Sequence, residues 1–126
     1  MKIQDVRLQP CHQRLADAGW AFARGALPQI EGHLLQITDE AGHQGLGYLH
    51  AIPAISTPGA AAQAAAQWLV PLLHGREADD IGSLMEEVEA RLAFNASAKA
   101  AVDMALHDLL ARRLGLPLHR LLGGAL

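Results

Sequence analysis

The sequence lacks the features that would support a disulfide framework, a nucleic-acid surface or a membrane span. Cys11 is the only cysteine in 126 residues, which excludes an internal disulfide and a thiolate metal cluster. The 10 lysines and arginines are scattered and outnumbered by 13 acidic residues, which argues against nucleic acid as a partner. No run of about 18 apolar residues occurs, and the N-terminus has no apolar signal-peptide core. These absences predict a cytoplasmic chain without nucleic-acid or membrane partners.

Aromatic residues are also scarce, at 4% of the chain, although apolar residues make up 51% of it. Alanine accounts for much of the apolar content. Small side chains let neighbouring elements approach closely, so this composition predicts a fine-grained core that is rich in helix. A chain of this length is expected to form one domain, spanning residues 1–126.

The first half of the chain has the apolar patterning of three β-strands, which are expected over residues 2–10, 30–38 and 44–51. Pro10 is the expected end of the first strand. Residues 11–29 have no clean period, and so long an irregular segment is either disordered or functional. A turn with Gly42 joins the last two strands, and Gly45 and Gly47 suggest close backbone packing or a bulge. The order predicts an antiparallel meander.

The second half has helical patterning instead. An alanine-rich helix is expected over residues 60–69, with Thr57 as its N-cap and an interruption at Pro71. Asp79 or Asp80 is expected to cap a second helix, whose apolar stripe is formed by Ile81, Leu84, Met85, Val88 and Leu92. Strands followed by helices predict an α+β fold, with a three-stranded antiparallel meander followed by a three-helix bundle.

The last expected helix is the most informative stretch of the chain. Asn95 or Ser97 can cap its N-terminus, and its apolar stripe is mostly alanine in the N-terminal half. Two arginines in its last turn, Gly115 at the C-cap and Pro117 beyond it form a consistent stop signal. A short apolar turn then leads to the glycine pair at residues 123–124.

Several motifs in this order resemble one known family. The run AKAAVDMALHDL at residues 98–109, followed by LPLHRLLGG at residues 116–124, is similar to the end of the N-terminal capping domain in the mandelate racemase/muconate-lactonizing branch of the enolase superfamily. The hairpin ITDEAG at residues 37–42 and the loop LVPLLHG at residues 69–75 resemble that domain too. In the family a catalytic (β/α)8 barrel follows this domain, so the resemblance implies an excised or truncated capping domain without its barrel.

The resemblance also implies what the domain does. In the family it is a lid that helps to select the substrate, with one segment between the first two strands and another after the third. The side chains implied as specificity residues are Leu15, Ala18, Trp20, Phe22, His50 and Ile52. The implied parent is a racemase, dehydratase or cycloisomerase that abstracts a proton next to a carboxylate, with Mg²⁺ stabilising the enolate. Its bases and metal ligands come from the barrel, so this chain is expected to carry no catalytic or metal residue.

Alternatives to these interpretations remain open at this point. The chain is alternatively a stand-alone interaction or oligomerisation module that keeps the lid fold. A homo-oligomer is expected, because apolar loop and helix surface would be uncovered without the barrel, and a strict monomer would count against the module. Trp20 and Phe22 either line a pocket or close the core beneath the loop. Asp103 and His107 favour an intrahelical contact over a metal site. Cys11 and His12 are adjacent in a strand-like segment, which disfavours a nucleophile–base pair.

Overall fold

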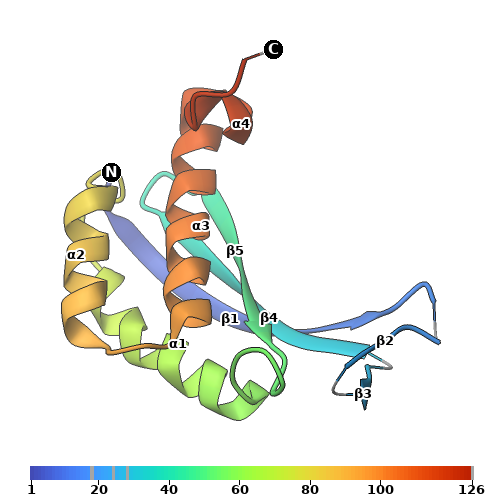
Figure 1. Cartoon of the computed structure of the whole chain (residues 1–126). Helices are drawn as coiled ribbons and strands as arrows, with labels where there is room; N and C mark the ends of the chain where they lie inside the picture. The colour runs from blue at the N-terminus through green and yellow to red at the C-terminus, as the bar shows by residue number, and fades with distance from the viewer. Residues whose placement is uncertain (18, 24, 28, 126) are drawn as a thin grey trace.

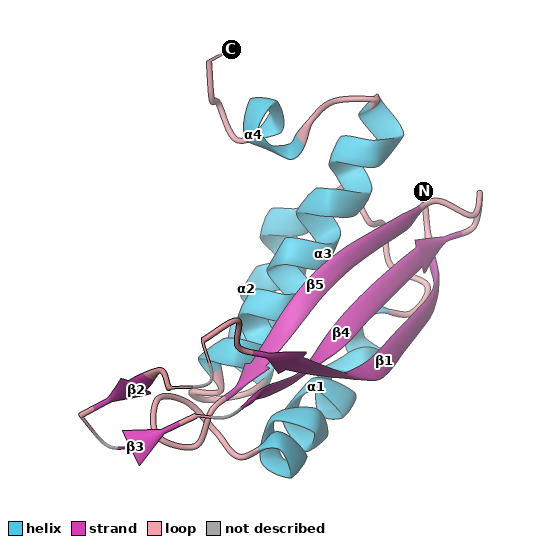
Figure 2. Cartoon of the chain, turned by 90° about the vertical axis from the view of Figure 1, so that its right-hand side faces the viewer, coloured by secondary structure: helices cyan, strands magenta, loops and turns pink. Residues whose placement is uncertain are grey.

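A three-stranded antiparallel sheet with helices over one face forms the body of the domain (Figures 1 and 2). The computed structural model describes residues 1–17, 19–23, 25–27 and 29–125. The sheet has the order β1-β4-β5, formed by Ile3–Arg14, Gln29–Asp39 and Gln44–Ala51. A two-stranded hairpin, β2 (Ala21–Phe22) and β3 (Gly25–Ala26), projects beyond one end of the sheet. The predicted α+β fold with a three-stranded meander is confirmed, and the described residues form no barrel.

Three helices and one short helical turn follow the sheet: α1 (Gly59–Leu73), α2 (Ile81–Arg91), α3 (Ala96–Leu114) and α4 (Leu118–Leu121). Helix α3 lies along β5, and α1 and α2 pack on its flanks (Figure 1). Gly115 ends α3 with a left-handed conformation, as the stop signal predicted. The short apolar turn after Pro117 is α4. The predicted three-helix bundle is therefore present, with one additional turn at its C-terminal end.

The hydrophobic core lies between the sheet and the helices. On β4 the odd-numbered residues Leu35 and Ile37 are fully buried, whereas their neighbours face the open side of the sheet. Gly45 and Gly47 of β5 let the backbone of α3 approach directly. A Cβ atom on Gly47 would overlap the carbonyl oxygen of Ala101, and one on Gly45 would overlap that of Ala105. The close backbone packing suggested by these glycines is confirmed.

The expected end of the first strand at Pro10 is wrong, because β1 continues to Arg14. Pro10 pairs with His33 of β4 and Arg14 pairs with Gln29, in an unbroken register. Strand β1 lies at the edge of the sheet, where a residue without a backbone N–H can face away from the only neighbouring strand. The segment 11–29 is therefore not irregular throughout: it holds the end of β1 and the β2–β3 hairpin.

The helix boundaries also differ from the expectations at two positions. Pro71 lies inside α1, which continues to Leu73, because the fully buried side chains of Leu69 and Leu73 hold the last turn against the core despite the missing N–H. The N-cap of α1 is Pro58 instead of Thr57. Asp80 and Asn95 occupy the N-cap positions of α2 and α3, but neither side chain makes a capping hydrogen bond.

The connection between α2 and α3 contains one residue, Phe94, whose backbone strain a substitution can relieve. Phe94 has a φ of 57° and is 90% exposed, so its ring gains little from burial in return for a left-handed backbone. We expect Phe94→Gly to raise the free energy of unfolding by about 0.5–1 kcal/mol, since glycine adopts this φ without a Cβ clash. Urea denaturation measures the change. Phe94→Ala is the control: an equal gain from alanine, which keeps the Cβ, would contradict strain as the cause.

Candidate functional site

The two segments implied as a lid lie at the end of the sheet that is farther from both chain termini (Figures 1 and 2). We define the hairpin segment as residues 15–29 and the second lid segment as residues 50–56. Both continue directly from strands of the main sheet: the hairpin segment leaves β1 and enters β4, and the second lid segment leaves β5. The sheet therefore holds both ends of the hairpin segment and the start of the second lid segment, whose other end leads to α1.

Trp20 and Phe22 form an aromatic pair on the hairpin segment. Their ring centroids are 5.8 Å apart and the ring planes are tilted by 32°. Trp20 is 45% exposed, and neither ring belongs to the hydrophobic core formed by the described residues. The interpretation that both side chains close the core is therefore wrong. The pair instead presents aromatic surface to the outside.

A local turn positions Trp20. The carboxylate of Asp17 accepts a hydrogen bond from the backbone N–H of Gly19 at 2.9 Å, and the N–H of Trp20 donates to the carbonyl of Asp17 at 3.2 Å. Asp17 was not among the expected site residues, although Asp-x-Gly is a recognisable turn signal. Leu15 is half-buried where β1 gives way to this turn, and Ala18 lies outside the described residues.

Ser56 fixes the second lid segment and contacts His50. The Ser56 hydroxyl oxygen lies 3.2 Å from His50 Nδ1 and accepts a hydrogen bond from the backbone N–H of Ile52 at 3.1 Å. The N–H groups of Ile55 and Ser56 both donate to the carbonyl of Ile52. The segment is thus a closed turn with an imidazole held at its entrance. Ser56 could not be singled out from the sequence, where it is only a hydroxyl residue in a loop.

Ile52 is buried, with 5% of its surface accessible. It lies in the wall of a cavity of about 310 Å³ whose lining residues come from both lid segments and from β4: Leu27, Gln29, Glu31, Ala51, Ile52 and Pro53. Glu31 supplies the charge in this otherwise largely apolar lining. Sequence reasoning missed both Leu27 and Glu31, because only the tertiary fold brings the start of β4 against the residues that follow β5.

The sheet separates His50 from this cavity. Cross-strand pairing sets Gly32 opposite His50 and Glu31 opposite Ala51, and successive strand residues point to opposite faces. His50 therefore shares a face with Tyr48, whose hydroxyl is buried against Gly32 without a hydrogen-bond partner among the described residues. Burial raises the pKa of the Tyr48 phenol, and the nearby Cys11 raises it further. His50 and the cavity residues Glu31 and Ala51 thus lie on opposite faces of the sheet.

Metal binding has no support in the described part of the chain. No three side chains of histidine, cysteine, aspartate or glutamate converge there on a point that could hold a metal ion. His107 Nδ1 lies 2.9 Å from the carbonyl oxygen and 3.3 Å from the carboxylate of Asp103, so the expected intrahelical contact is confirmed. Cys11 and His12 are successive residues of β1.

Among the residues that the structure describes, no helix combines the length and apolar character that crossing a bilayer requires.

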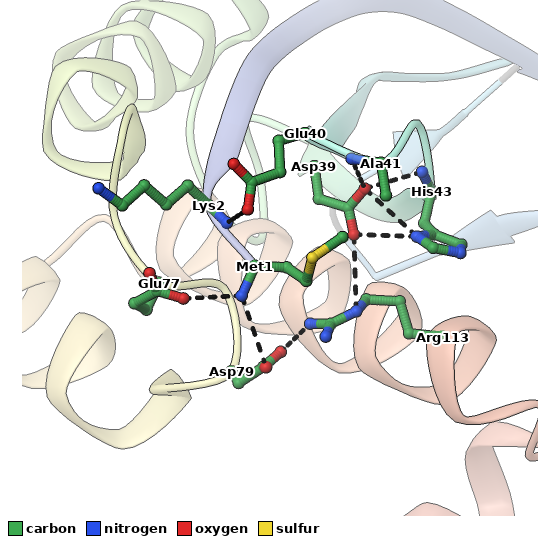
Figure 3. A network of polar contacts seen from close by, with 9 residues as sticks. All are labelled: Met1, Lys2, Asp39, Glu40, Ala41, His43, Glu77, Asp79 and Arg113. Carbon is green, nitrogen blue, oxygen red and sulfur yellow. Dashed lines mark hydrogen bonds and ion pairs between the residues drawn. The ribbon is translucent and has the colours of Figure 1, made fainter.

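A buried carboxylate organises the opposite end of the sheet (Figure 3). Asp39 is fully buried at the end of β4, and its Oδ1 accepts the backbone N–H groups of Ala41 and His43 at 2.9 Å each. Its Oδ2 lies 3.1 Å from His43 Nδ1 and 3.6 Å from Arg113 Nε, and Arg113 also pairs with Asp79. Burial alone would raise the pKa of Asp39, but the hydrogen bonds from His43 and Ala41 outweigh it and lower that pKa. The network ties the β4–β5 turn to the end of α3.

Comparisons of the sequence with known proteins identify relatives along most of the chain. The family model for the mandelate racemase / muconate lactonizing enzyme N-terminal domain matches residues 11–123. An L-Lys-D/L-Arg epimerase of Methylococcus capsulatus is 34% identical over 129 residues, which cover 99% of this chain and 35% of that protein. Muconate cycloisomerase 1 of Rhodococcus opacus is 52% identical over 59 residues, or 47% of this chain and 16% of that protein. The chain thus spans at most 35% of either relative.

Solved structures agree with these sequence relationships. A dipeptide epimerase from Cytophaga hutchinsonii, complexed with Mg and the dipeptide D-Ala-L-Val, is 29% identical with a TM-score of 0.92, covering 99% of this chain and 34% of that one. A dipeptide epimerase from Enterococcus faecalis, complexed with Mg and L-Leu-L-Tyr, is 27% identical with a TM-score of 0.91, covering 98% of this chain and 35% of that one. In both, the similarity covers nearly all of this chain and about a third of the larger protein.

Proposed function

Since this chain belongs to the mandelate racemase / muconate lactonizing enzyme family and matches its N-terminal domain, we propose that it is the substrate-specificity lid of an enzyme whose catalytic (β/α)8 barrel lies outside these 126 residues. The observation that carries the proposal is the meeting of the two lid segments around one cavity at the end of the sheet. Secondary-structure elements far apart in the sequence supply its wall, and a protruding aromatic pair stands on the adjoining hairpin.

The proposed parent reaction is proton abstraction next to a substrate carboxylate, as in a racemase, epimerase, dehydratase or cycloisomerase. Mg²⁺ in the barrel would stabilise the enolate, and the two dipeptide epimerases with bound Mg support this. No described residues of this chain gather as ligands for the metal, so its proposed contribution is confined to binding the substrate and excluding water. The proposed setting is the cytoplasm, which agrees with a single unpaired cysteine.

The structure changes which side chains are proposed to contact the substrate. Trp20 and Phe22 remain candidates, since they present aromatic surface on the hairpin segment. His50 remains one through its position at the entrance of the turn that Ser56 closes. Ile52 is proposed to form a buried part of the cavity wall. Glu31 is a further candidate for contact with the substrate, because its carboxylate would favour a cationic or hydrogen-bond-donating substrate group.

Activity measurements test whether this chain selects the substrate while the barrel supplies the catalytic groups. We expect the purified chain with Mg²⁺ to show no turnover of dipeptides, muconate or acid sugars, because it supplies neither base nor metal ligands. Placed ahead of the barrel of the Cytophaga hutchinsonii enzyme, in exchange for that enzyme's own N-terminal domain, it should support turnover. In that chimera Trp20→Ala and His50→Ala should change the ratio of kcat/KM between two dipeptides by about 10-fold or more.

Gly82→Ala on α2 is the control for this experiment, because nothing lies within 4 Å of the added methyl group and it is remote from both lid segments. Its kcat/KM ratio should equal that of the unaltered chimera. Turnover by the isolated chain that survives repurification would contradict the proposal. So would a chimera whose substrate preference ignores both lid substitutions.

A further inference from the structure

The cavity at the lid end of the sheet combines one carboxylate with largely apolar walls. Leu27, Ala51, Ile52 and Pro53 supply apolar surface, and the polar lining comes from β4, from Gln29 and Glu31. Cross-strand pairing places Glu31 directly opposite Ala51, so the carboxylate and the apolar wall share one face of the sheet. Glu31 itself is exposed, so a group that enters the cavity from outside can reach its carboxylate.

The carboxylate of Glu31 has no partner among the residues that the structure describes. Glu40, Glu77, Glu87 and Glu89 all accept hydrogen bonds from nitrogen donors, and the last three form ion pairs. Glu31 forms neither kind of contact with a described residue. Most glutamates of this domain thus have a structural partner, whereas the one in the cavity keeps its acceptor oxygens available.

The start of α1 forms the nearest part of the surroundings of Glu31. A Cβ atom on Gly59, the first residue of α1, would lie 3.6 Å from Glu31 Oε2. The positive end of a helix dipole favours a negative charge at this position, and the first turn of α1 contains no acidic residue. No backbone N–H of α1 donates to the carboxylate, because Ala62 donates to the carbonyl of Pro58 instead. The helix therefore supports the charge of Glu31 without occupying its oxygens.

We propose that the substrate carries an ammonium or guanidinium group on an aliphatic stem, that this cavity receives that group, and that Glu31 is the specificity-determining residue. The inference rests on the proposed function, since it assigns a substrate class to the same lid. The cavity of about 310 Å³ lies at the lower end of the roughly 300–1,000 Å³ of small-molecule sites. It therefore receives one substituent of the substrate, and the reacting part lies outside it.

The lining favours this substituent over other kinds. An anionic group would be repelled by Glu31, and a purely apolar group would remove water from the carboxylate without replacing its hydrogen bonds. An ammonium or guanidinium supplies both the charge and the donors, and the amide oxygen of Gln29 can accept a further hydrogen bond. The methylene groups of the stem can pack on Leu27 and Ile52, as the stems of lysine and arginine pack on apolar surface.

Titration of the 126-residue chain with small probes tests the cavity without any catalysis. We expect n-butylammonium to cause saturable changes in the amide NMR signals of Ala51 and Ile52, with an affinity about 10-fold or more above that of n-butanol. Glu31→Gln should remove this preference. Glu86→Gln is the matched control, because it deletes an exposed carboxylate of α2 that is remote from the cavity. Equal binding of both probes, or an ammonium affinity that Glu31→Gln leaves unchanged, overturns the inference.

Kinetics of the chimera with the Cytophaga hutchinsonii barrel test the substrate class. The ratio of kcat/KM for a lysine dipeptide to that for the corresponding norleucine dipeptide should fall by about 10-fold or more in Glu31→Gln and stay constant in Glu86→Gln. Equal losses for both dipeptides overturn the inference, since Glu31 would then pair with the barrel. A preference that responds to Trp20→Ala but not to Glu31→Gln overturns the inference and leaves the lid function intact. A preference that ignores every lid substitution contradicts the proposed function itself.

Discussion

Replacing Gly47 with alanine lowers the free energy of unfolding by about 3 kcal/mol or more, the largest effect expected of any single methyl group in this domain. The added Cβ would overlap the carbonyl oxygen of Ala101, which belongs to the backbone of α3 and cannot turn away as a flexible side chain can. Relief requires α3 to move off β5, and that movement opens the core around Leu49 and Val102. A domain of this size is marginally stable, so much of its stability would be lost.

Chemical denaturation followed by circular dichroism measures this loss. Gly82→Ala is the matched control, since it makes the same change in α2, where nothing lies within 4 Å of the new methyl group. We expect it to raise the free energy of unfolding by about 0.5–1 kcal/mol, because alanine is the better helix former. Gly45→Ala should resemble Gly47→Ala, since its Cβ would overlap the carbonyl oxygen of Ala105. A Gly47→Ala domain as stable as the parent would show that α3 does not lie this close to β5.

Asp39→Asn lowers the free energy of unfolding by about 3 kcal/mol at neutral pH, the second large effect. The fully buried carboxylate accepts hydrogen bonds from Ala41 and His43 and lies beside Arg113. The amide is uncharged and presents an NH₂ group where one oxygen accepted. Arg113 is left without its buried counter-charge at the end of α3. Asp5→Asn is the control: Asp5 is half-exposed and pairs with the exposed Arg7, so its loss should cost less than about 1 kcal/mol.

The contribution of Asp39 should also depend on pH in a defined direction. Its pKa in the folded protein is lower than the ordinary value of 3.8, which means that the folded state favours the ionised form. The stabilisation is therefore fully present above the unfolded-state pKa and is lost as the pH falls through the lower, folded-state pKa. Denaturation at a series of pH values should show the wild type approaching Asp39→Asn in stability as the pH falls below about 3.8. A constant difference between the two at all pH values would contradict this origin.

Local patterns were sufficient to predict most of the fold. Period-two alternation identified the strands, the helical stripe identified α2, and the Gly115 stop ended α3 correctly, because each depends on residues within a few positions of one another. The errors occurred where a distant contact outweighed a local signal. Pro10 remains inside a strand because β1 is an edge strand, and Pro71 remains inside α1 because the core holds its last turn.

The candidate site likewise contains residues that could be predicted from the sequence and residues that could not. The aromatic pair Trp20 and Phe22 could be singled out from the sequence, since exposed aromatic residues in an irregular segment are distinctive on their own. Glu31, Ser56 and Asp39 could not, because a carboxylate or hydroxyl in a strand or turn is an ordinary feature until its neighbours are known. Their importance comes from partners that only the fold supplies: the cavity wall, the imidazole of His50 and the guanidinium of Arg113.

The sequence by itself determined the class of fold, the order of its elements and the family to which the chain belongs, because short-range periodicity and motifs encode all three. Only the tertiary structure decided that Ile52 is a buried cavity wall, that α3 packs directly on Gly45 and Gly47, and that the buried Asp39 has a lowered pKa. The physical reason is that burial, close approach and pKa depend on which distant segments meet. Contacts between distant segments are properties of the folded chain, and no local stretch of sequence specifies them.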